Sequence, residues 1–512
     1  MTKNFKWLLL VALTFVACNT DEEGVTEVPV SPGSADFSKY VALGDSFAAG
    51  YSDNALFPKG QENAYPNIIA QQLAAAGGGA FTSPWMSSDN IGGFSLGGNQ
   101  VVSTRLFFNG SGPVNVPGVT STLLTDHISG TVNNMGIPGA KSYHLVYSGY
   151  AGLNPYFGRI ASAPTATVLA DAVAQSPSFF SLWIGGNDVL GYATSGGVGV
   201  NQTGNLNPAT YGNGDITDPN VFASVFNTLV NNLTANGAKG VVANLPYVNT
   251  LPYFTTVPYN PLTAKVLGSG NEATGQATIT ALNAQLYGPL HNALAFLGQG
   301  SRIQLLSSTG GNPMLIKDET LTNLSTSLTA VLVGGGVPQA TAGAFGAIFG
   351  QVRQTTATDL VLLPTQSVLG TAPTAANSGI GVAPSAPLNK FGITFPLQDK
   401  DVLIPSEIAA VATATDAYNA TIQSVADTKG LAFVDAKATM NSLLNGGINF
   451  DGYNMTTTYV TGNSFSLDGV HPGARGYALI ANRFIEAINA KYGSTLKNVK
   501  AANYQILYPA SF

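Results

Sequence analysis

The sequence predicts an α/β protein in which two layers of helices enclose a central parallel sheet of about five strands. Short apolar runs, typical of strands buried on both faces, alternate along the chain with longer segments of helical periodicity. Of the 512 residues, 45% are hydrophobic and only 9% are charged, so the chain can bury a large core. In sheets of this kind, ligands bind beyond the carboxyl ends of the strands, which is where we expect a functional site.

Five apolar runs are the predicted strands, and five periodic segments are the predicted helices. The strands are expected at residues 40–43, 131–135, 179–184, 240–243 and 431–434. The helices are expected at residues 64–75, 221–235, 277–297, 405–429 and 472–492. In the last helix, Pro472 is expected at the first helical position and Gly493 just past the end, because these residues favour those positions.

Three long stretches fit no element of the sheet. They lie near 77–130, 190–219 and 301–398 and are rich in Gly, Ala, Thr, Ser and Asn. Within the third, apolar residues at helical spacing over 321–352 predict a helical hairpin. The candidate site described below draws on segments from both ends of the chain. We therefore interpret residues 37–495 as one domain with insertions, followed by a tail at 496–512.

The first residues predict an export signal. Two lysines precede an apolar run at residues 7–17, which is too short to cross a bilayer core of roughly 30 Å, so 1–17 is interpreted as a signal peptide. The run ends at Cys18, the only cysteine, within a segment that resembles a bacterial lipobox. The alternative is an ordinary signal peptide that happens to contain a cysteine. We expect lipidation at Cys18 and a flexible acidic tether over 18–36.

These features predict an exported outer-membrane lipoprotein that meets the membrane only through its anchor. The acidic residues directly after Cys18 also resemble a signal for display at the cell surface. The net charge of −6 and the pI near 5.2 provide no basic face, so we expect no nucleic-acid partner.

No cofactor or metal is expected. His127, His144 and His291 lack metal-ligand spacing, and no glycine loop of the phosphate-binding type is present. The acidic segment 399–401 is interpreted as a solvated turn and not as a cation site.

Ser46 is the candidate nucleophile. It follows the predicted strand at 40–43 and precedes sequence compatible with a helix, so its hydroxyl is expected at a strand end. A serine hydroxyl attacks an ester only when a neutral imidazole takes its proton and fixed donors hold the resulting oxyanion. The alternative for the Gly-Asp-Ser segment is a turn with a helix-capping serine.

Three further segments supply the other groups. Asp468 and His471 lie three residues apart, so a helical turn would place them on one face, where the carboxylate fixes the imidazole tautomer. Asn187 follows the predicted strand at 179–184, although an Asn-Asp turn is an alternative. Gly139 follows the strand at 131–135, where its N–H can approach an oxyanion closely, although a Gly/Pro turn is an alternative.

Together these segments resemble those of the SGNH hydrolases, also called GDSL esterases and lipases, which are named for their Ser, Gly, Asn and His. The resemblance implies a flavodoxin-like fold and a covalent ester at Ser46, with His471 as the base and Asp468 orienting it. It also implies an oxyanion hole formed by the N–H groups of Ser46 and Gly139 and by the side chain of Asn187. The familiar Gly-Asp-Ser-Leu reads Gly-Asp-Ser-Phe here, and Phe47 is expected to pack without taking part in the chemistry.

The expected substrates are lipid or simple acyl esters, as for an esterase, lipase or lysophospholipase. The hairpin at 321–352 is interpreted as a lid over an acyl chain. Beyond the signal segment the only tryptophans are Trp85 and Trp183, whereas sugar-binding platforms often use this residue. One alternative is a polysaccharide acetyl esterase. Another is a surface binding lipoprotein that keeps the fold without catalysis.

A second serine lies in a G-x-S-x-G sequence. Ser95, within residues 93–97, matches the nucleophile elbow of α/β-hydrolases, which requires a strand before it and a helix after it. Polar residues flank this segment on both sides, so we interpret it as a glycine-rich loop.

Overall fold

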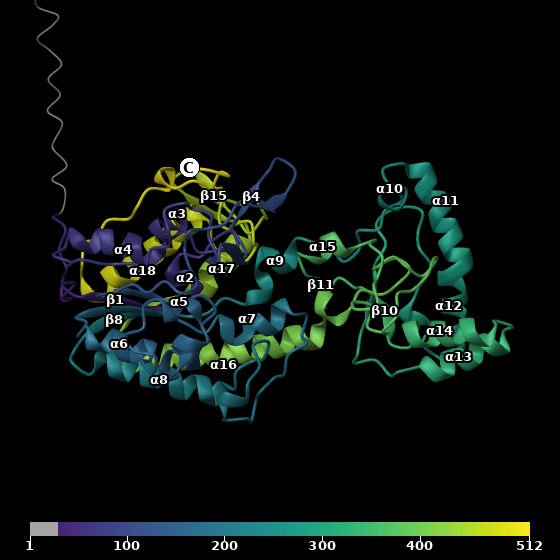
Figure 1. Cartoon of the computed structure of the whole chain (residues 1–512), viewed down its shortest axis with the longest axis horizontal. Coiled ribbons are helices and arrows are strands. Elements are labelled where there is room, and N and C mark those ends of the chain that lie inside the picture. Colours follow the sequence, from purple (N-terminus) through teal and green to yellow (C-terminus); the bar gives the residue numbers. More distant parts are fainter. Residues whose placement is uncertain (1–28) are drawn as a thin grey trace, which may run out of the picture.

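The computed structural model describes residues 29–512, so the predicted signal segment, Cys18 and part of the tether lie outside the described residues. A sheet of five parallel strands forms the centre, in the order β13-β8-β7-β1-β6 (Figure 1). Its strands are β1 (Tyr40–Gly44), β6 (Asn134–Gly136), β7 (Phe179–Trp183), β8 (Lys239–Ala243) and β13 (Ala432–Val434). The predicted fold class is confirmed.

Helices cover both faces of this sheet (Figure 1). One layer contains α4 (Tyr65–Ala74), α17 (Ala436–Leu444) and α18 (Ala474–Tyr492), and the other contains α6 (Val168–Ala174), α8 (Pro219–Thr234) and α16 (Pro405–Lys429). In the first layer, the Trp183 ring of β7 contacts Tyr65 and Phe484 at centroid distances of 5.7 and 6.0 Å. In the second, Phe222 stacks on Tyr418 at 4.3 Å. Every residue of β1 and β7 is buried, so both faces of these strands are covered.

Helix α18 begins two residues later than expected. Gly473 is its N-cap, and Pro472 lies before the cap, where it pairs as an isolated bridge with Phe465. Pro472 is thus not at the first helical position, because the chain at that point is still extended against its neighbour. Gly493 ends the helix in the left-handed region, at φ 67°, as expected.

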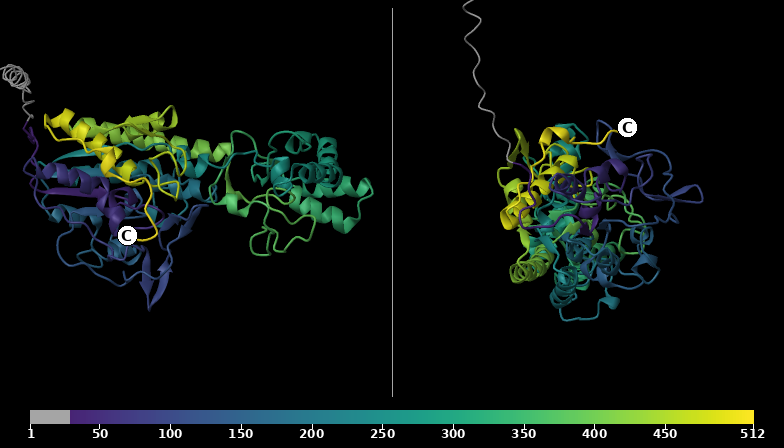
Figure 2. Two further views of the ribbon diagram at one scale, coloured as in Figure 1. Left: turned by 90° about the horizontal axis from the view of Figure 1, so that it is seen from above. Right: turned by 90° about the vertical axis from the view of Figure 1, so that its left-hand side faces the viewer.

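A second lobe projects from the carboxyl edge of the sheet and has its own apolar core (Figures 1 and 2). The buried residues of that core run from Leu262 to Ile404. The lobe contains α10 (Ala264–Leu267), α11 (Glu272–Leu282), α12 (Gly288–Phe296), β9 (Leu315–Lys317), α13 (Ser325–Gly334), α14 (Gln339–Phe349), β10 (Val352–Gln354), β11 (Leu360–Val361), α15 (Thr365–Val368) and β12 (Val402–Leu403). A short helix, α9 (Pro252–Thr255), leads into it.

Two interpretations of this lobe need correction. The helix expected at 277–297 forms as α11 and α12, joined by a π-helical turn at Asn283–Tyr287, but it packs in the second lobe and not against the sheet. The predicted hairpin forms as α13 and α14. It lies at the far end of the lobe in both figures, away from α2 (Ser46–Ala49), so it does not cover Ser46 as a lid (Figures 1 and 2).

The remaining elements are short. The stretch near 77–130 contains two β-hairpins, β2 (Phe94–Leu96) with β3 (Asn99–Val102) and β4 (Leu106–Phe108) with β5 (Pro113–Asn115). Ser95 therefore lies in a strand and not in a loop. The others are α3 (Pro58–Glu62), α5 (Pro155–Gly158), α7 (Asn187–Thr194), β14 (Ile448–Phe450) and β15 (Tyr453–Met455).

The described chain begins beside the end of α18. Ser34 N–H donates to the carbonyl oxygen of Tyr492, and Ser31 N–H donates to Thr495 Oγ1. The Tyr492 hydroxyl in turn donates to the carbonyl of Gly240 near the start of β8, so this region marks the amino edge of the sheet. Within residues 29–512, no helix combines the length and apolar character needed to cross a membrane.

Candidate active site

Ser46 lies where β1 gives way to α2. The Asp45 side chain caps this helix by accepting a hydrogen bond from Phe47 N–H at 3.0 Å, which fixes the turn after Gly44. Ser46 is the first residue of α2 and is only 4% exposed. Because first-turn N–H groups have no acceptor within their own helix, the Ser46 N–H remains available to an anion.

His471 contacts Ser46 across most of the chain's length. Its Nε2 lies 2.9 Å from Ser46 Oγ, and its Nδ1 lies 2.9 Å from Asp468 Oδ2. An ionised carboxylate only accepts hydrogen bonds, so the Nδ1 atom carries the proton and Nε2 is free to accept one from Ser46. The structure thus brings together the three side chains expected to form the triad.

A tight turn, and not the expected helical turn, holds the Asp468 carboxylate. Its Oδ1 accepts the backbone N–H groups of Val470 and His471, each at 2.8 Å, and Gly469 between them has φ 73°, outside the right-handed helical region. Oδ2 also accepts the Asn54 N–H at 2.9 Å. Burial raises the pKa of Asp468, but the charge of His471 and these hydrogen bonds outweigh it and lower the pKa to about 2. An ionised Asp468 can therefore stabilise the positive charge that forms on His471.

The backbone conformation at Gly139 is one that favours glycine. Pro138 and Gly139 are the central residues of a turn closed by the Ala140 N–H, which donates to the carbonyl of Ile137 at 3.0 Å. The φ of 78° at Gly139 is that of the third residue of a type II turn. A Cβ atom there would meet no other group within 4 Å, so strain and not crowding disfavours other residues.

Asn187 and Asp188 tie the start of α7 to this turn. The Asn187 amide donates one hydrogen to the carbonyl of Ala140 at 2.9 Å, which leaves its second hydrogen for a ligand. The fully buried Asp188 accepts from Ser142 N–H at 2.8 Å and from Ser142 Oγ at 2.7 Å. Burial raises the pKa of Asp188, while these bonds oppose the shift. The sequence predicted an oxyanion donor at Asn187 but no role for Asp188 beyond a possible Asn-Asp turn, so this supporting role was missed.

Carbonyl groups of the stretch at 190–219 bind the residue that follows this turn. Lys141 is only 3% exposed, and its Nζ donates to the carbonyl oxygens of Asp215 at 2.7 Å and Gly212 at 3.3 Å. Lys141 directly follows Ala140, so the insertion fixes the segment that carries Gly139.

Aromatic rings surround the imidazole. The Tyr51 and Phe47 rings lie 4.7 and 5.5 Å from the His471 ring, and Phe47 also packs on Trp183 at 5.1 Å. Trp183 is only 7% exposed. The surroundings of Ser46 on this side are therefore apolar.

Tyr253 and Leu363, which lead into the second lobe and form its stem, contact the loop between Asp468 and His471. Tyr253 N–H donates to the carbonyl of Gly469 at 2.9 Å, and Leu363 N–H donates to the carbonyl of Tyr253 at 2.8 Å. A Cβ atom on Gly469 would lie 3.0 Å from the Tyr253 nitrogen and 3.1 Å from a methyl carbon of Leu363. The loop between Asp468 and His471 is thus packed against residues that lead into the second lobe.

Ser95 and the three remaining histidines of the described chain bond to other partners. Ser95 is 2% exposed, and its Oγ donates to the carbonyl of Thr120 at 2.7 Å. His127, His144 and His291 each contact a backbone group.

The segment Asp399–Asp401 is solvated only in part, since Lys400 is exposed but Asp401 is 6% exposed. Asp401 accepts from Gln398 N–H at 2.9 Å, and the backbone of Asp399 and Lys400 lies against Gly196. In residues 29–512, one group of three acidic side chains has oxygens within 4.8 Å of one another, namely Glu319, Asp399 and Glu407.

Comparison with known proteins identifies one family. The family model described as GDSL-like Lipase/Acylhydrolase matches residues 40–323, which is more than half of the chain. The matched region includes Ser46, Gly139 and Asn187, whereas Asp468 and His471 lie beyond it. No curated protein and no solved structure matches the chain.

Proposed function

We propose, since the chain belongs to the GDSL-like lipase and acylhydrolase family of serine ester hydrolases, that it cleaves carboxylic esters of lipids or simple acyl groups through a covalent ester at Ser46. The observation that carries the proposal is the chain of contacts from Ser46 Oγ through the His471 ring to Asp468, each 2.9 Å long. This arrangement has the donor and acceptor order that an acyl transfer to serine requires.

In the first half of the reaction, Ser46 Oγ attacks the ester carbonyl carbon while His471 Nε2 takes its proton. The carbonyl oxygen becomes an oxyanion, and the N–H groups of Ser46 and Gly139 and the Asn187 amide donate to it. Asp468 stabilises the charge that forms on His471. The intermediate then collapses, the carbon–oxygen bond to the alcohol breaks, and His471 gives its proton to the leaving alcohol.

Water completes the cycle. His471, again neutral, takes a proton from a water molecule that attacks the acyl carbon, and the same donors hold the second oxyanion. When the bond to Ser46 Oγ breaks, the serine oxygen recovers a proton from His471 and the carboxylic acid leaves. No step requires a group other than those described.

Covalent labelling tests the nucleophile directly. A fluorophosphonate probe should label Ser46, and peptide mapping should locate the adduct on that residue. A panel of p-nitrophenyl esters from acetate to palmitate, together with acetylated glycans, then measures the substrate range. A folded protein that neither reacts with the probe nor cleaves any ester would instead support the binding-lipoprotein alternative.

The surroundings of Ser46 favour acyl esters over acetylated polysaccharide. Trp183 is buried against Phe47 and Tyr65, so it offers no exposed ring on which a sugar could stack. Faster turnover of acetylated glycan than of every p-nitrophenyl ester would reverse this preference.

The proposal includes an anchor at Cys18, in an exported outer-membrane lipoprotein. Its support is the position of the only cysteine directly after a short apolar segment. In cells given an alkyne-bearing palmitate, the wild-type protein should take up the label and fractionate with membranes. A Cys18→Ser variant that is labelled equally would contradict the assignment.

A further inference from the structure

Two apolar cavities lie beside the candidate active site and share one wall. Phe47, Trp183, Pro246 and Leu251 line both of them. Their volumes are about 40 Å³ for the nearer cavity and about 70 Å³ for the farther one. Phe47 follows Ser46 directly in the chain, so this shared wall begins next to the nucleophile.

The nearer cavity is lined by residues that neighbour the site residues in the chain. Its lining includes Asp45, Gly186 and Val470, which are the immediate neighbours of Ser46, Asn187 and His471. The rest of its lining is apolar, including Val189, Leu190 and Val248, and the carboxylate of Asp45 is bound by Phe47 N–H. This apolar space therefore begins at the two residues on either side of Ser46 in the chain, Asp45 and Phe47.

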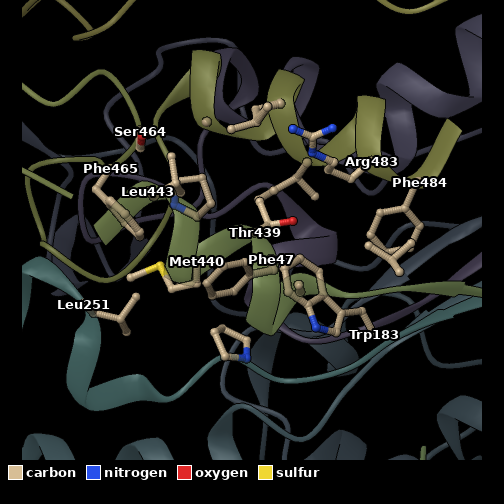
Figure 3. Close-up of a pocket in the computed structure, with 17 residues that line it drawn as sticks. Phe47, Trp183, Leu251, Thr439, Met440, Leu443, Ser464, Phe465, Arg483 and Phe484 are labelled. Carbon is tan, nitrogen blue, oxygen red and sulfur yellow. The ribbon is translucent and has the colours of Figure 1, made fainter. Parts of the chain in front are cut away.

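The farther cavity lies between two helices of the first layer. Ala436, Met440 and Leu443 of α17 line one side, and Leu479, Ile480 and Phe484 of α18 line another (Figure 3). Its one charged lining residue is Arg483, which is ion-paired with Glu486 at 2.7 Å. The charge is thus satisfied outside the cavity, and its walls favour a ligand with no polar groups.

We infer that the two cavities are successive parts of one acyl-binding channel, divided by the Phe47 ring, and that the preferred substrates are esters of straight-chain acids of medium length. The inference rests on the proposed function, because the acyl chain enters from the ester at Ser46. Both cavities are small, so we expect them to take an acyl chain of medium length and not a whole palmitoyl chain. Octanoate represents such a medium-length chain in the tests that follow.

Chain-length profiles of the purified protein test the channel. Each methylene moved from water into an apolar site favours binding by about fourfold. We expect kcat/KM for p-nitrophenyl esters to rise at least about a hundredfold from acetate to octanoate and then to level off. A profile that is flat or falls beyond acetate, in a protein that still cleaves acetate at Ser46, would overturn the channel and leave the proposed function standing.

A matched pair of substitutions on α17 makes the test specific. Ala436→Leu fills part of the farther cavity and should lower the ratio of octanoate to acetate kcat/KM by roughly tenfold, the worth of about two methylenes. Ala438→Leu makes the same change on the solvent side of the same helix and should leave the ratio unchanged. Equal ratios in the two variants would contradict the inference. If Ala436→Leu does not fold, Thr439→Leu, which also lines the cavity, replaces it.

A change at Phe47 tests the partition. Phe47→Leu removes the ring but keeps an apolar side chain, so the octanoate-to-butanoate ratio should rise several-fold, because butanoate fits the nearer cavity alone. An unchanged ratio would show that Phe47 does not divide the channel. Failure of the proposed function has a different signature, namely no ester cleavage at any chain length and no labelling of Ser46.

Discussion

The sheet-bearing lobe and the second lobe bury separate apolar cores, but they differ in what their elements provide. In the first, the carboxyl ends of β1, β6 and β7 bring Ser46, Gly139 and Asn187 to one edge. The second lobe supplies none of the groups assigned to the reaction. Its stem instead contacts the loop of His471 through Tyr253 and Gly469. The comparison separates residues that perform chemistry from residues that hold them in place, and four substitutions can test that separation.

Ser46→Ala should have the largest effect. Removal of the nucleophile is expected to lower kcat by on the order of 10⁴-fold or more, because no other group forms the acyl intermediate. Hydrolysis of p-nitrophenyl butanoate measures the loss. Ser95→Ala is the control, since the Ser95 hydroxyl donates to the carbonyl of Thr120 and not to His471, and it should retain wild-type turnover. Comparable turnover by the two variants would refute the assignment.

Asn187→Ala should rank second. Loss of one oxyanion donor is expected to lower kcat by roughly 10²- to 10³-fold with a smaller change in KM, because the donor acts mainly in the transition state. Asn227→Ala, at an exposed position of α8, is the control. A change confined to KM would place Asn187 in substrate binding instead.

Gly469→Ala tests the contact between the lobes. A Cβ atom there would press on Tyr253 and displace the loop of Asp468 and His471, so kcat/KM should fall roughly 10- to 10²-fold. Gly452→Ala provides the control, because Gly452 also has positive φ, at 86°, but a Cβ atom would meet nothing within 4 Å. If both variants lose activity equally, backbone strain and not the contact with the stem is responsible.

Glu407→Gln should have the smallest effect. It should change the pH dependence of stability and leave activity unchanged. Burial, with Asp399 and Glu319 nearby, raises the pKa of Glu407 to about 8, and burial together with Glu319 raises that of Asp399 to about 7. The folded protein therefore binds these protons more tightly than the unfolded chain does. Their stabilisation is present at low pH and is lost as the pH rises toward 8.

Glutamine mimics the protonated acid, so the decrease in Tm between pH 5 and pH 8 should be smaller in this variant by about 1–3 °C. Calorimetry at the two pH values provides the measurement, and Glu272→Gln, at an exposed position of α11, is the control. An equal decrease in both variants would show that the acidic group between the lobes does not couple stability to pH.

The sequence predicted the sheet-bearing lobe better than the second lobe, for a physical reason. Strands buried on both faces must be apolar throughout, so β1 and β7 stand out as continuous apolar runs. Helical periodicity, in contrast, reveals that a helix has an apolar face but not what covers it. The segment at 277–297 was therefore predicted to be helical but placed against the wrong partner.

Within the site, side chains with a chemical role could be predicted, and backbone contacts could not. The meeting of Ser46 and His471 follows from their residue types and flanking segments. The Asn54 N–H that binds Asp468 leaves no mark on the sequence, because any residue except proline carries that group. The spacing of Asp468 and His471 suggested a helical turn. Gly469 has positive φ instead, and the Asp468 carboxylate accepts the backbone N–H of His471.

The described chain enters the sheet-bearing lobe at the amino edge of the sheet, away from the candidate active site. Ser31 and Ser34 are held beside Tyr492 and Thr495, at the opposite end of the strands from Ser46. With the proposed acylation at Cys18, the membrane anchor would be attached at the end of the sheet opposite Ser46. The tether would then leave the body at the end farthest from Ser46, so the anchor would not obstruct the approach of an ester to the reactive end.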